Sequence, residues 1–387
     1  MRTPIYLDHA ATTPVRAEVR SAMEPFFDTR FGNPSSTHRW GREARAALDE
    51  ARERIARTLG ANPDEICFTS GGTEGDNLAI LGAWRARRAE GRTAVISTPI
   101  EHKAILGAVH EAVAEGAQER SIPVSAAGVA NRQALPGLLA DDVAVCSVMW
   151  VNNEIGTIQP VPEMAEDVKA SGALFHTDAV QAFGKVPIDL AALAVDLLTI
   201  SGHKIGAPKG IGAIFIRRGT PLRPLLYGGS QDRGRRPGTE NVAFAVGLAR
   251  AVELAAAERE ASCARLGAMR DRLEQALLAK VPDAVVHGRG APRAPNILNL
   301  SVPGTDSESL LMALDMAGVA CSSGSACQSG TVDPSHVLAA MGVPSEIAVS
   351  AVRMSLGSLT TDESIDRVAE LFPALIAKAR RLSGAVS

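Results

Sequence analysis

The stretch EICFTSGGTEGDNLAILGAWRARRAEG, residues 65–91, decides the fold. It opens with a short apolar run of strand-forming residues, turns on two glycines and continues with the apolar spacing of a helix. A strand that leads through a glycine turn into a helix is the start of a βαβ unit. Backbone N–H groups and a threonine at such a turn suit a phosphate, although an ordinary strand-to-helix connection explains the turn more simply when it is taken alone.

The same alternation of apolar runs and helical stretches continues to about residue 218. It predicts an α/β fold with a mostly parallel, doubly wound sheet. Beyond it, residues 242–280 read as one long helix, broken near Gly267, and the remaining residues as a smaller α+β region. The further predicted strands are TAVISTP (93–99), DVAVCSVMW (142–150), ALFHTDA (173–179), DLLTIS (196–201) and GAIFIRR (212–218).

The bulk composition excludes several classes of protein. The 387 residues are 46% hydrophobic and 21% charged, with a net charge of -3, which gives no reason to expect nucleic acid or an anionic membrane as a partner. No apolar run approaches the roughly 18 residues that cross a bilayer, and the first residues lack a signal-peptide core. Five scattered cysteines do not form a disulfide framework. We therefore expect a cytoplasmic protein with reduced cysteines.

Polar residues follow five of the predicted strands. In open α/β sheets ligands bind beyond the carboxyl ends of the strands, so residues at those ends are expected to form one site. The residues in question are Gly71-Gly72-Thr73, Glu101-His102, Asn152-Asn153, Asp178 with Gln181, and Ser201 with His203 and Lys204.

Lys204 is the most informative of these residues. It follows a strand in ISGHKIGAPKGIG, residues 200–212, where a surface lysine is the plain alternative. Pyridoxal 5'-phosphate needs an amine for its aldehyde, an acid at its ring nitrogen and an anion site for its phosphate. Lys204, Asp178 and the glycine turn supply these three groups. Gln181, on the same helical face as Asp178, suits the phenolic oxygen, and His102 suits either stacking on the ring or a structural role.

Arg353 is the only charge in IAVSAVRMSLGSL, residues 347–359. A lone charge in an apolar strand needs a partner, and the arginine fork matches a carboxylate in bidentate fashion. A structural ion pair and a substrate carboxylate both meet that requirement.

At this point the chain resembles the cysteine desulfurases, which are aminotransferase-class-V enzymes of PLP fold type I. The resemblance extends in unbroken order from Tyr6 to Leu356, and SSGSAC marks the class that includes the iron–sulfur and nitrogenase-type enzymes. Ala207, Ser230, Asp232 and Pro237 depart from the commoner residues. The segments that carry the resemblance are YLDHAATTP, GNPSSTH, TSGGTEGDN, EHKAI, VNNEIGTIQP, HTDAVQAFGK, SGHKIGAPKGIG, RRPGTEN and SSGSAC.

The resemblance implies a role for each matching residue. The catalytic residues would be Cys327, Lys204 and His102. Asn153 and Arg353 would hold the carboxylate of L-cysteine. Thr239 would reach the phosphate held by the partner subunit, which implies a homodimer. The cofactor-binding residues would be Lys204, Asp178, Gln181, Thr73, Gly72, Ser201, His203, Thr239 and His102.

The loop CSSGSACQSG, residues 321–330, sets a cysteine among small, flexible residues. A disulfide between Cys321 and Cys327 does not suit a reduced compartment, and a zinc site would need more ligands than His336 adds. A mobile nucleophile explains the composition, because a sulfur carrier must reach a substrate and then present its cargo. Cys327 ends the SSGSAC motif and is the expected nucleophile, whereas Cys321 is expected to be a packed or accessory thiol.

The expected activity is removal of sulfur from L-cysteine, giving L-alanine and a persulfide on Cys327. The sulfur would pass to an acceptor or scaffold protein for iron–sulfur cluster assembly or thiolation. A selenocysteine lyase, another class V enzyme and an idle scaffold protein are the alternatives. No metal is expected. We expect residues 15–250 to form the large cofactor-binding domain, and residues 1–14 with 251–387 the small domain that carries the nucleophile loop.

Overall fold

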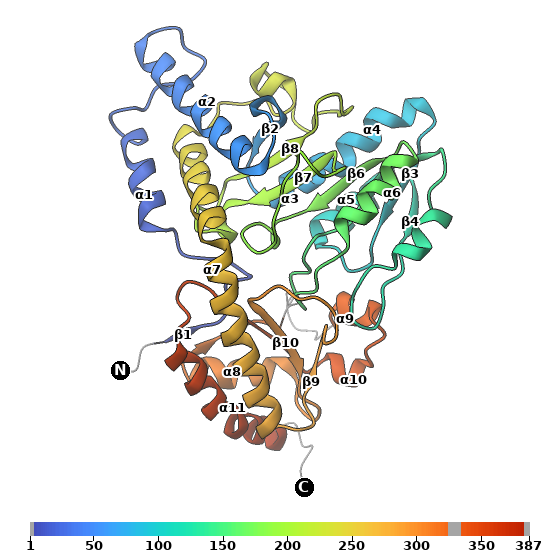
Figure 1. Cartoon of the computed structure of the whole chain (residues 1–387), viewed down its shortest axis with the longest axis vertical. Coiled ribbons are helices and arrows are strands. Elements are labelled where there is room, and N and C mark those ends of the chain that lie inside the picture. Colours follow the sequence, from blue (N-terminus) through green and yellow to red (C-terminus); the bar gives the residue numbers. More distant parts are fainter. Residues whose placement is uncertain (1–3, 324–333, 383–387) are drawn as a thin grey trace.

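The computed structural model describes residues 4–323 and 334–382. Its centre is a seven-stranded sheet in the order β2-β8-β7-β6-β5-β3-β4 (Figure 1). Most neighbouring strands run parallel, as predicted, while β8 is antiparallel to both β2 and β7. The strands are β2 (Ile66–Thr69), β3 (Ala94–Ser97), β4 (Gln118–Ser121), β5 (Val143–Ser147), β6 (Leu174–Asp178), β7 (Leu197–Ser201) and β8 (Gly212–Ile216).

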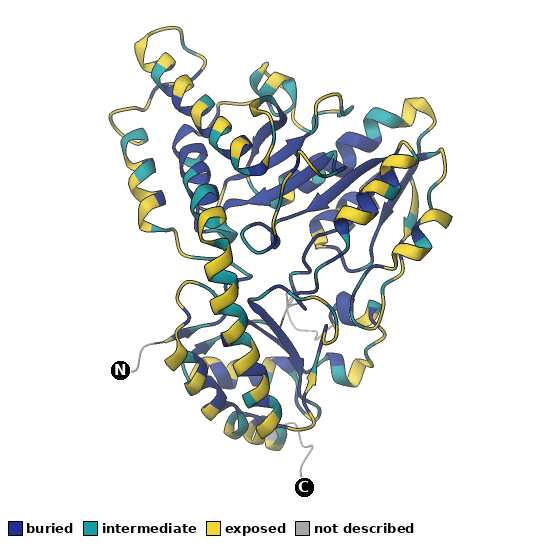
Figure 2. Cartoon of the chain, viewed as in Figure 1, coloured by how far each residue is buried: buried dark blue, intermediate teal, exposed yellow. Residues whose placement is uncertain are grey.

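Helices cover both faces of this sheet, so its central strands are buried throughout (Figure 2). Successive strand residues point to opposite faces. Phe175 accordingly packs with α2 (Arg39–Leu59), α6 (Val161–Ala170) and the first part of α7 (Val242–Lys280). Leu174 instead packs with α5 (Lys103–Ala114) and the helical stretch of α3 (Gly72–Asn77), η3 (Leu78–Gly82) and α4 (Ala83–Arg87).

Helix α7 is continuous from Val242 to Lys280, so the predicted break near Gly267 is wrong. Both ends of the helix are held by packing. Its first part lies in the core beside the large sheet, and residues from Met269 to Leu277 lie in a second core. Tertiary packing at both ends outweighs the roughly 1 kcal/mol that a helical glycine costs.

The second core lies around a smaller sheet in the order β12-β10-β9. It contains apolar residues of the C-terminal helix α11 (Asp362–Leu382) and, from the other end of the chain, Ile5 and Leu7. Strand β1 (Ile5–Tyr6) pairs in parallel with β11 (Val319–Ala320). The remaining elements are α1 (Ala17–Met23), β9 (Val285–Val286), β10 (Ile297–Ser301), α8 (Ser307–Met316), α9 (His336–Ala340), α10 (Ser345–Ala348) and β12 (Ala351–Ser355), with the short 3-10 turns η1 (Glu24–Phe26), η2 (Pro63–Glu65), η4 (Arg88–Glu90), η5 (Arg132–Gly137), η6 (Gly202–Lys204) and η7 (Gln231–Gly234).

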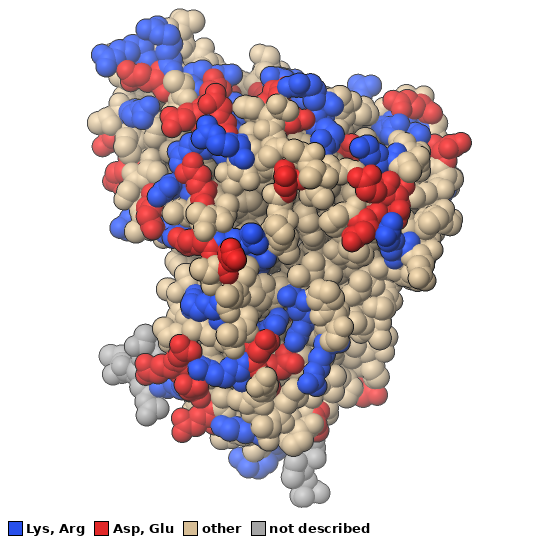
Figure 3. Space-filling model, viewed as in Figure 1, with Lys and Arg blue, Asp and Glu red and all other residues tan. Residues whose placement is uncertain are grey.

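Basic and acidic side chains lie interspersed over the face of the molecule shown in Figure 3. Within residues 4–323 and 334–382, no helix has the length and apolar character that a membrane span requires.

Candidate active site

A cavity of about 420 Å³ lies at the carboxyl ends of β6 and β7. It brings together residues from separate predicted strand ends, as the parallel sheet requires. Ala10 and Ala11 of the N-terminal segment and Ser322 also line it. The predicted site residues in its wall are Gly72, Thr73, His102, Asn153, Asp178, Gln181, Ser201, His203, Lys204 and Arg353.

Lys204 ends η6, the turn that follows β7. Its Nζ donates to the carbonyl oxygens of Ala10 at 2.7 Å and Ala11 at 2.8 Å. Burial, together with the positive charges of Arg353 and Lys185, lowers the pKa of Lys204 to about 8. The amine is therefore neutral in a larger share of molecules at neutral pH than an exposed lysine, which suits it to react with an aldehyde.

Asp178 is the last residue of β6 and is buried. Its Oδ1 accepts a hydrogen bond from the Val180 backbone N–H at 2.8 Å. Burial raises the pKa of Asp178, and the charges of His102 and Lys204 oppose that rise. A cation placed against this carboxylate would therefore be strongly stabilised.

Gln181 does not lie on a helix, contrary to the prediction. Residues 179–185 form successive turns, in which the Phe183 N–H donates to Ala179 O at 2.8 Å. The Nε2 of Gln181 donates to Ala10 O at 2.8 Å, and its buried Oε1 has no partner among the described residues. An unpaired buried amide oxygen indicates that a donor from a ligand or water belongs there.

His102 precedes α5 and caps it, because its Nδ1 accepts from the Ala104 N–H at 3.2 Å. This bond assigns the proton of the neutral ring to Nε2. Burial is the largest influence on the pKa of His102 and lowers it, which favours that neutral form. Nε2 of His102 is thus a hydrogen-bond donor.

Gly72, Thr73, Ser201 and His203 also line the cavity. A Cβ on Gly72 would lie 2.8 Å from Cγ2 of Val180, so this position accommodates only glycine without a shift. Burial lowers the pKa of His203 to about 4. The ring of His203 is therefore neutral, and its Nδ1 lies 3.1 Å from Thr12 Oγ1.

Arg353 lies in β12 and is buried. Its Nη2 donates to Asp8 Oδ1 at 2.8 Å and its Nη1 to the carbonyl oxygen of Asn153 at 2.9 Å. The buried Nε has no partner among the residues described. The arginine thus makes a structural ion pair and keeps one buried donor without a partner among the described residues. Asp8 is a site residue that the sequence reasoning missed, although it lies within the quoted motif YLDHAATTP.

Two further buried acids lie near Asp178. Glu101 accepts from the Met149 N–H at 2.9 Å and from Thr98 Oγ1 at 2.7 Å, and burial raises its pKa to about 8. Burial likewise raises the pKa of Asp76, which lines the cavity. Both side chains can therefore remain protonated, which limits repulsion against the Asp178 carboxylate. The sequence reasoning gave Asp76 no role.

One predicted residue, Thr239, lies away from the cavity wall. Thr239 lines a separate cavity of about 190 Å³ with Ser70 and Arg236. Cys327 lies outside the described residues. Cys321 is half-buried, and burial raises the pKa of its thiol to about 12, so it is not a ready nucleophile.

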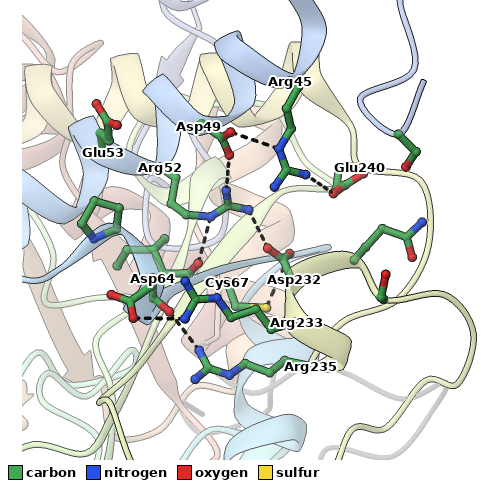
Figure 4. A pocket seen from close by; sticks show the side chains of 15 residues that line it. Arg45, Asp49, Arg52, Glu53, Asp64, Cys67, Asp232, Arg233, Arg235 and Glu240 are labelled. Carbon is green, nitrogen blue, oxygen red and sulfur yellow. Dashed lines mark hydrogen bonds and ion pairs between the residues drawn. The ribbon is translucent and has the colours of Figure 1, made fainter. Parts of the chain in front are cut away.

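A larger cavity, of about 620 Å³, lies between α2 and the segment 230–240 (Figure 4). We call it the arginine cavity. Most of its charges pair with one another: Arg52 donates to Asp49 at 2.9 Å and to Asp232 at 2.5 Å, and Arg233 donates to Asp64 at 3.0 Å. None of the residues that form the site of Lys204 lines it. No group of three or more metal-binding side chains occurs in the described part of the chain.

The residues of the Lys204 cavity fit pyridoxal 5'-phosphate. A lysine with a lowered pKa, a buried aspartate and an unpaired glutamine oxygen line it. Gly72 and the hydroxyl-bearing residues Thr73 and Ser201 line the same cavity. These are the amine, acid, acceptor and anion site that the cofactor requires.

Comparison with known proteins agrees with this arrangement. The model of the aminotransferase class-V family matches residues 5–368. The chain is 47% identical over 380 residues to the cysteine desulfurase NifS of Azotobacter vinelandii, covering 98% of this chain and 94% of that protein. It is 44% identical to the cysteine desulfurase IscS of Dictyoglomus turgidum, covering 99% and 97%. A solved NifS-like protein superimposes with a TM-score of 0.91 at 36% identity, covering 97% of this chain and all of that one.

Proposed function

The chain belongs to the aminotransferase class-V family and is a pyridoxal-phosphate-dependent cysteine desulfurase of PLP fold type I, and from this we propose which residues carry the reaction. The observation that supports the assignment best is the meeting of Lys204, Asp178, Gln181 and Arg353 in one cavity. Pyridoxal 5'-phosphate, when bound, supplies an electron sink for the negative charge that develops at the substrate Cα.

We propose that Lys204 holds the cofactor covalently, since its pKa of about 8 leaves more of the amine neutral than in an exposed lysine. Asp178 would pair with the protonated ring nitrogen. Gln181 would bond the phenolic group, since its Oε1, which has no partner among the described residues, can accept from a phenolic O–H. Gly72, Thr73, Ser201 and His203 would hold the phosphate. His102 would stack on the ring, with its Nε2–H directed to the substrate.

Arg353 and Asn153 are proposed to bind the carboxylate of L-cysteine. The unpaired Nε of Arg353 supports this role, because a substrate carboxylate would give that buried donor its missing partner. Asp8 already occupies Nη2, so it fixes the guanidinium in place and prevents a buried, uncompensated charge before substrate arrives.

The amine of Lys204, once released, would remove the proton from the substrate Cα. The thiolate of Cys327 would then attack the substrate sulfur, so that an S–S bond forms while the C–S bond breaks. The products are L-alanine and a persulfide on Cys327. Support comes from Ser322, which lines the cavity five positions before Cys327. Five residues span at most about 18 Å, so the chain limits the Cα of Cys327 to that distance from the Cα of Ser322.

The test is mass spectrometry of the peptide that bears Cys327 after the protein has reacted with L-cysteine. We expect the mass of one added sulfur and an equivalent amount of alanine. Cys327→Ala should lose the added sulfur and keep the absorbance of the bound cofactor. The matched variant Cys321→Ala should keep both. Full desulfurase activity in Cys327→Ala would contradict the assignment.

We further propose a homodimer, in which Thr239 contacts the phosphate bound by the partner subunit. The position of Thr239 outside its own chain's cofactor cavity supports this arrangement. The sulfur acceptor is proposed to be an iron–sulfur scaffold or a thiolation protein. Among the described residues the four cysteines are free thiols, which supports a reducing, cytoplasmic setting.

We propose the domain division 15–250 and 1–14 with 251–387. Ile5 and Leu7 support it by packing in the second core, while Val19 packs in the core beside the large sheet.

A further inference from the structure

A second cavity, of about 380 Å³, adjoins the active site along helix α7. We call it the α7 cavity. The N-terminal segment separates the two: Ala10 and Ala11 line the active-site cavity, whereas His9 and Thr13 line the α7 cavity. Lys204 borders both. The other walls come from α7, from the turn after β6 and from the segment 356–358.

Besides Lys204, two cations line the α7 cavity without a carboxylate partner among the described residues. The Nζ of Lys185 makes no hydrogen bond or ion pair with those residues. Arg265 donates to the carbonyl oxygens of Thr360 at 3.0 Å and Gly357 at 3.2 Å, and to Met269 Sδ at 3.5 Å.

Glu258, the acid that lines this cavity, already has a cationic partner. Glu258 receives two hydrogen bonds of 2.7 Å from Arg16, so it is satisfied as the partner of that arginine. His9 adds no negative charge, and burial lowers its pKa and keeps it neutral. The cavity therefore carries the charges of Lys185 and Arg265 in excess.

Arg265 is exposed, whereas Lys185 is half-buried, and a half-buried cation without a counter-ion is stabilised when a ligand supplies negative charge. Burial accordingly lowers the pKa of Lys185 to about 8. Asn296 also lines the cavity, is buried, and has an Oδ1 atom that accepts no hydrogen bond from the described residues. Two cations without a carboxylate partner and one acceptor without a donor thus line the same cavity.

We infer that the α7 cavity binds a small organic dianion, such as a dicarboxylate or a phosphate ester. Its two negative charges balance Lys185 and Arg265, and a hydroxyl or amino group on the ligand donates to Asn296. A volume of about 380 Å³ exceeds that of a four-carbon dicarboxylate and leaves room for water.

The position of the site gives the ligand an effect on catalysis, a step that rests on the proposed function. The charge of Lys185 lowers the pKa of Lys204. A bound dianion offsets that charge and raises the pKa of Lys204, so less of its amine is neutral at a given pH. Occupation of the α7 cavity therefore slows desulfuration at neutral pH.

The test is calorimetric titration of the cofactor-loaded protein with L-malate, succinate and inorganic phosphate. We expect L-malate to bind, with succinate weaker because it lacks the hydroxyl group. Tighter binding of phosphate than of L-malate would identify a phosphate ester as the natural ligand. Because each charged hydrogen bond is worth a factor of roughly 10 to 100, Lys185→Met and Arg265→Met should each weaken binding by that factor.

The control variant is Lys378→Met, which removes an exposed lysine from α11 outside the cavity and should bind as the original protein does. Lys185→Arg keeps the charge and should retain binding, which separates loss of the site from loss of the fold. Unchanged binding in both Lys185→Met and Arg265→Met would place the anion at Arg353 and overturn the inference. So would the absence of binding by all three anions at millimolar concentration. Neither result depends on desulfurase activity.

Discussion

The buried carboxyl group of Glu101 makes the stability of the fold depend on pH. Its side chain is fully buried, and it accepts hydrogen bonds from the Met149 N–H and the Thr98 hydroxyl. Burial raises its pKa from 4.5 to about 8, with a smaller contribution from the charge of Asp178. The replacement Glu101→Gln keeps the shape and the acceptor oxygen but removes the titration.

The sign of the pH dependence follows from which state, folded or unfolded, binds the proton. Between pH 4.5 and about 8 the folded protein keeps the proton on Glu101 and the unfolded chain has lost it, so unfolding releases a proton. The free energy of unfolding therefore falls as the pH rises through this range and levels off above it. At about 1.4 kcal/mol per pH unit, Glu101 removes about 4 kcal/mol of stability between pH 5 and pH 8.

The variant Glu101→Gln should not lose this stability as the pH rises. Its stability relative to the original protein should improve by about 4 kcal/mol between pH 5 and pH 8. The assay is urea unfolding at both pH values, with cofactor and protein concentration held constant because the cofactor binds the folded state. Glu163→Gln, an exposed position on α6, is the control and should track the original protein. Parallel stability curves for Glu101→Gln and the original protein would refute the reasoning.

Three further outcomes follow from other parts of the fold. Attachment of the cofactor to the apoprotein, followed by absorbance, should speed up with pH around a midpoint near 8, since the neutral amine of Lys204 reacts; a midpoint near 10.5 would contradict this. Arg353→Gln should raise the KM for L-cysteine by roughly 10- to 100-fold in an alanine-release assay, and an unchanged KM would exclude a carboxylate contact. Arg233 has a φ of 60°, so Arg233→Gly should stabilise the fold by about 1 kcal/mol in urea unfolding. Arg235→Gly, at a φ of -73°, should destabilise it, and equal effects would rule out backbone strain.

The sequence predicted the large sheet well because its central strands are buried on both faces and read as continuous apolar runs. Strand β4 was missed because it has no apolar run. Its residues, QERS, are polar because it is an edge strand, largely exposed, so no apolar run marks it. The continuous helix through Gly267 was missed because packing at its two distant ends, rather than local propensity, holds it.

The sequence could predict those site residues that lie at the ends of the strands. Lys204 and Asp178 follow adjacent parallel strands, so their meeting follows from the topology. The contact of Asp8 with Arg353 did not follow, because it joins segments 345 positions apart and leaves no local pattern in the sequence. The turns that position Gln181 were mistaken for a helix, since a three-residue spacing is common to both.

The pairing of the N-terminal segment with β12 bears on the order in which the site is completed in the cell. The Ser355 N–H donates to Leu7 O at 2.7 Å, and residues 8–13 then reach the turn that carries Lys204. A ribosome synthesises Leu7 long before Ser355. The pocket of a nascent chain therefore stays incomplete until β12 has been synthesised and has paired with this segment.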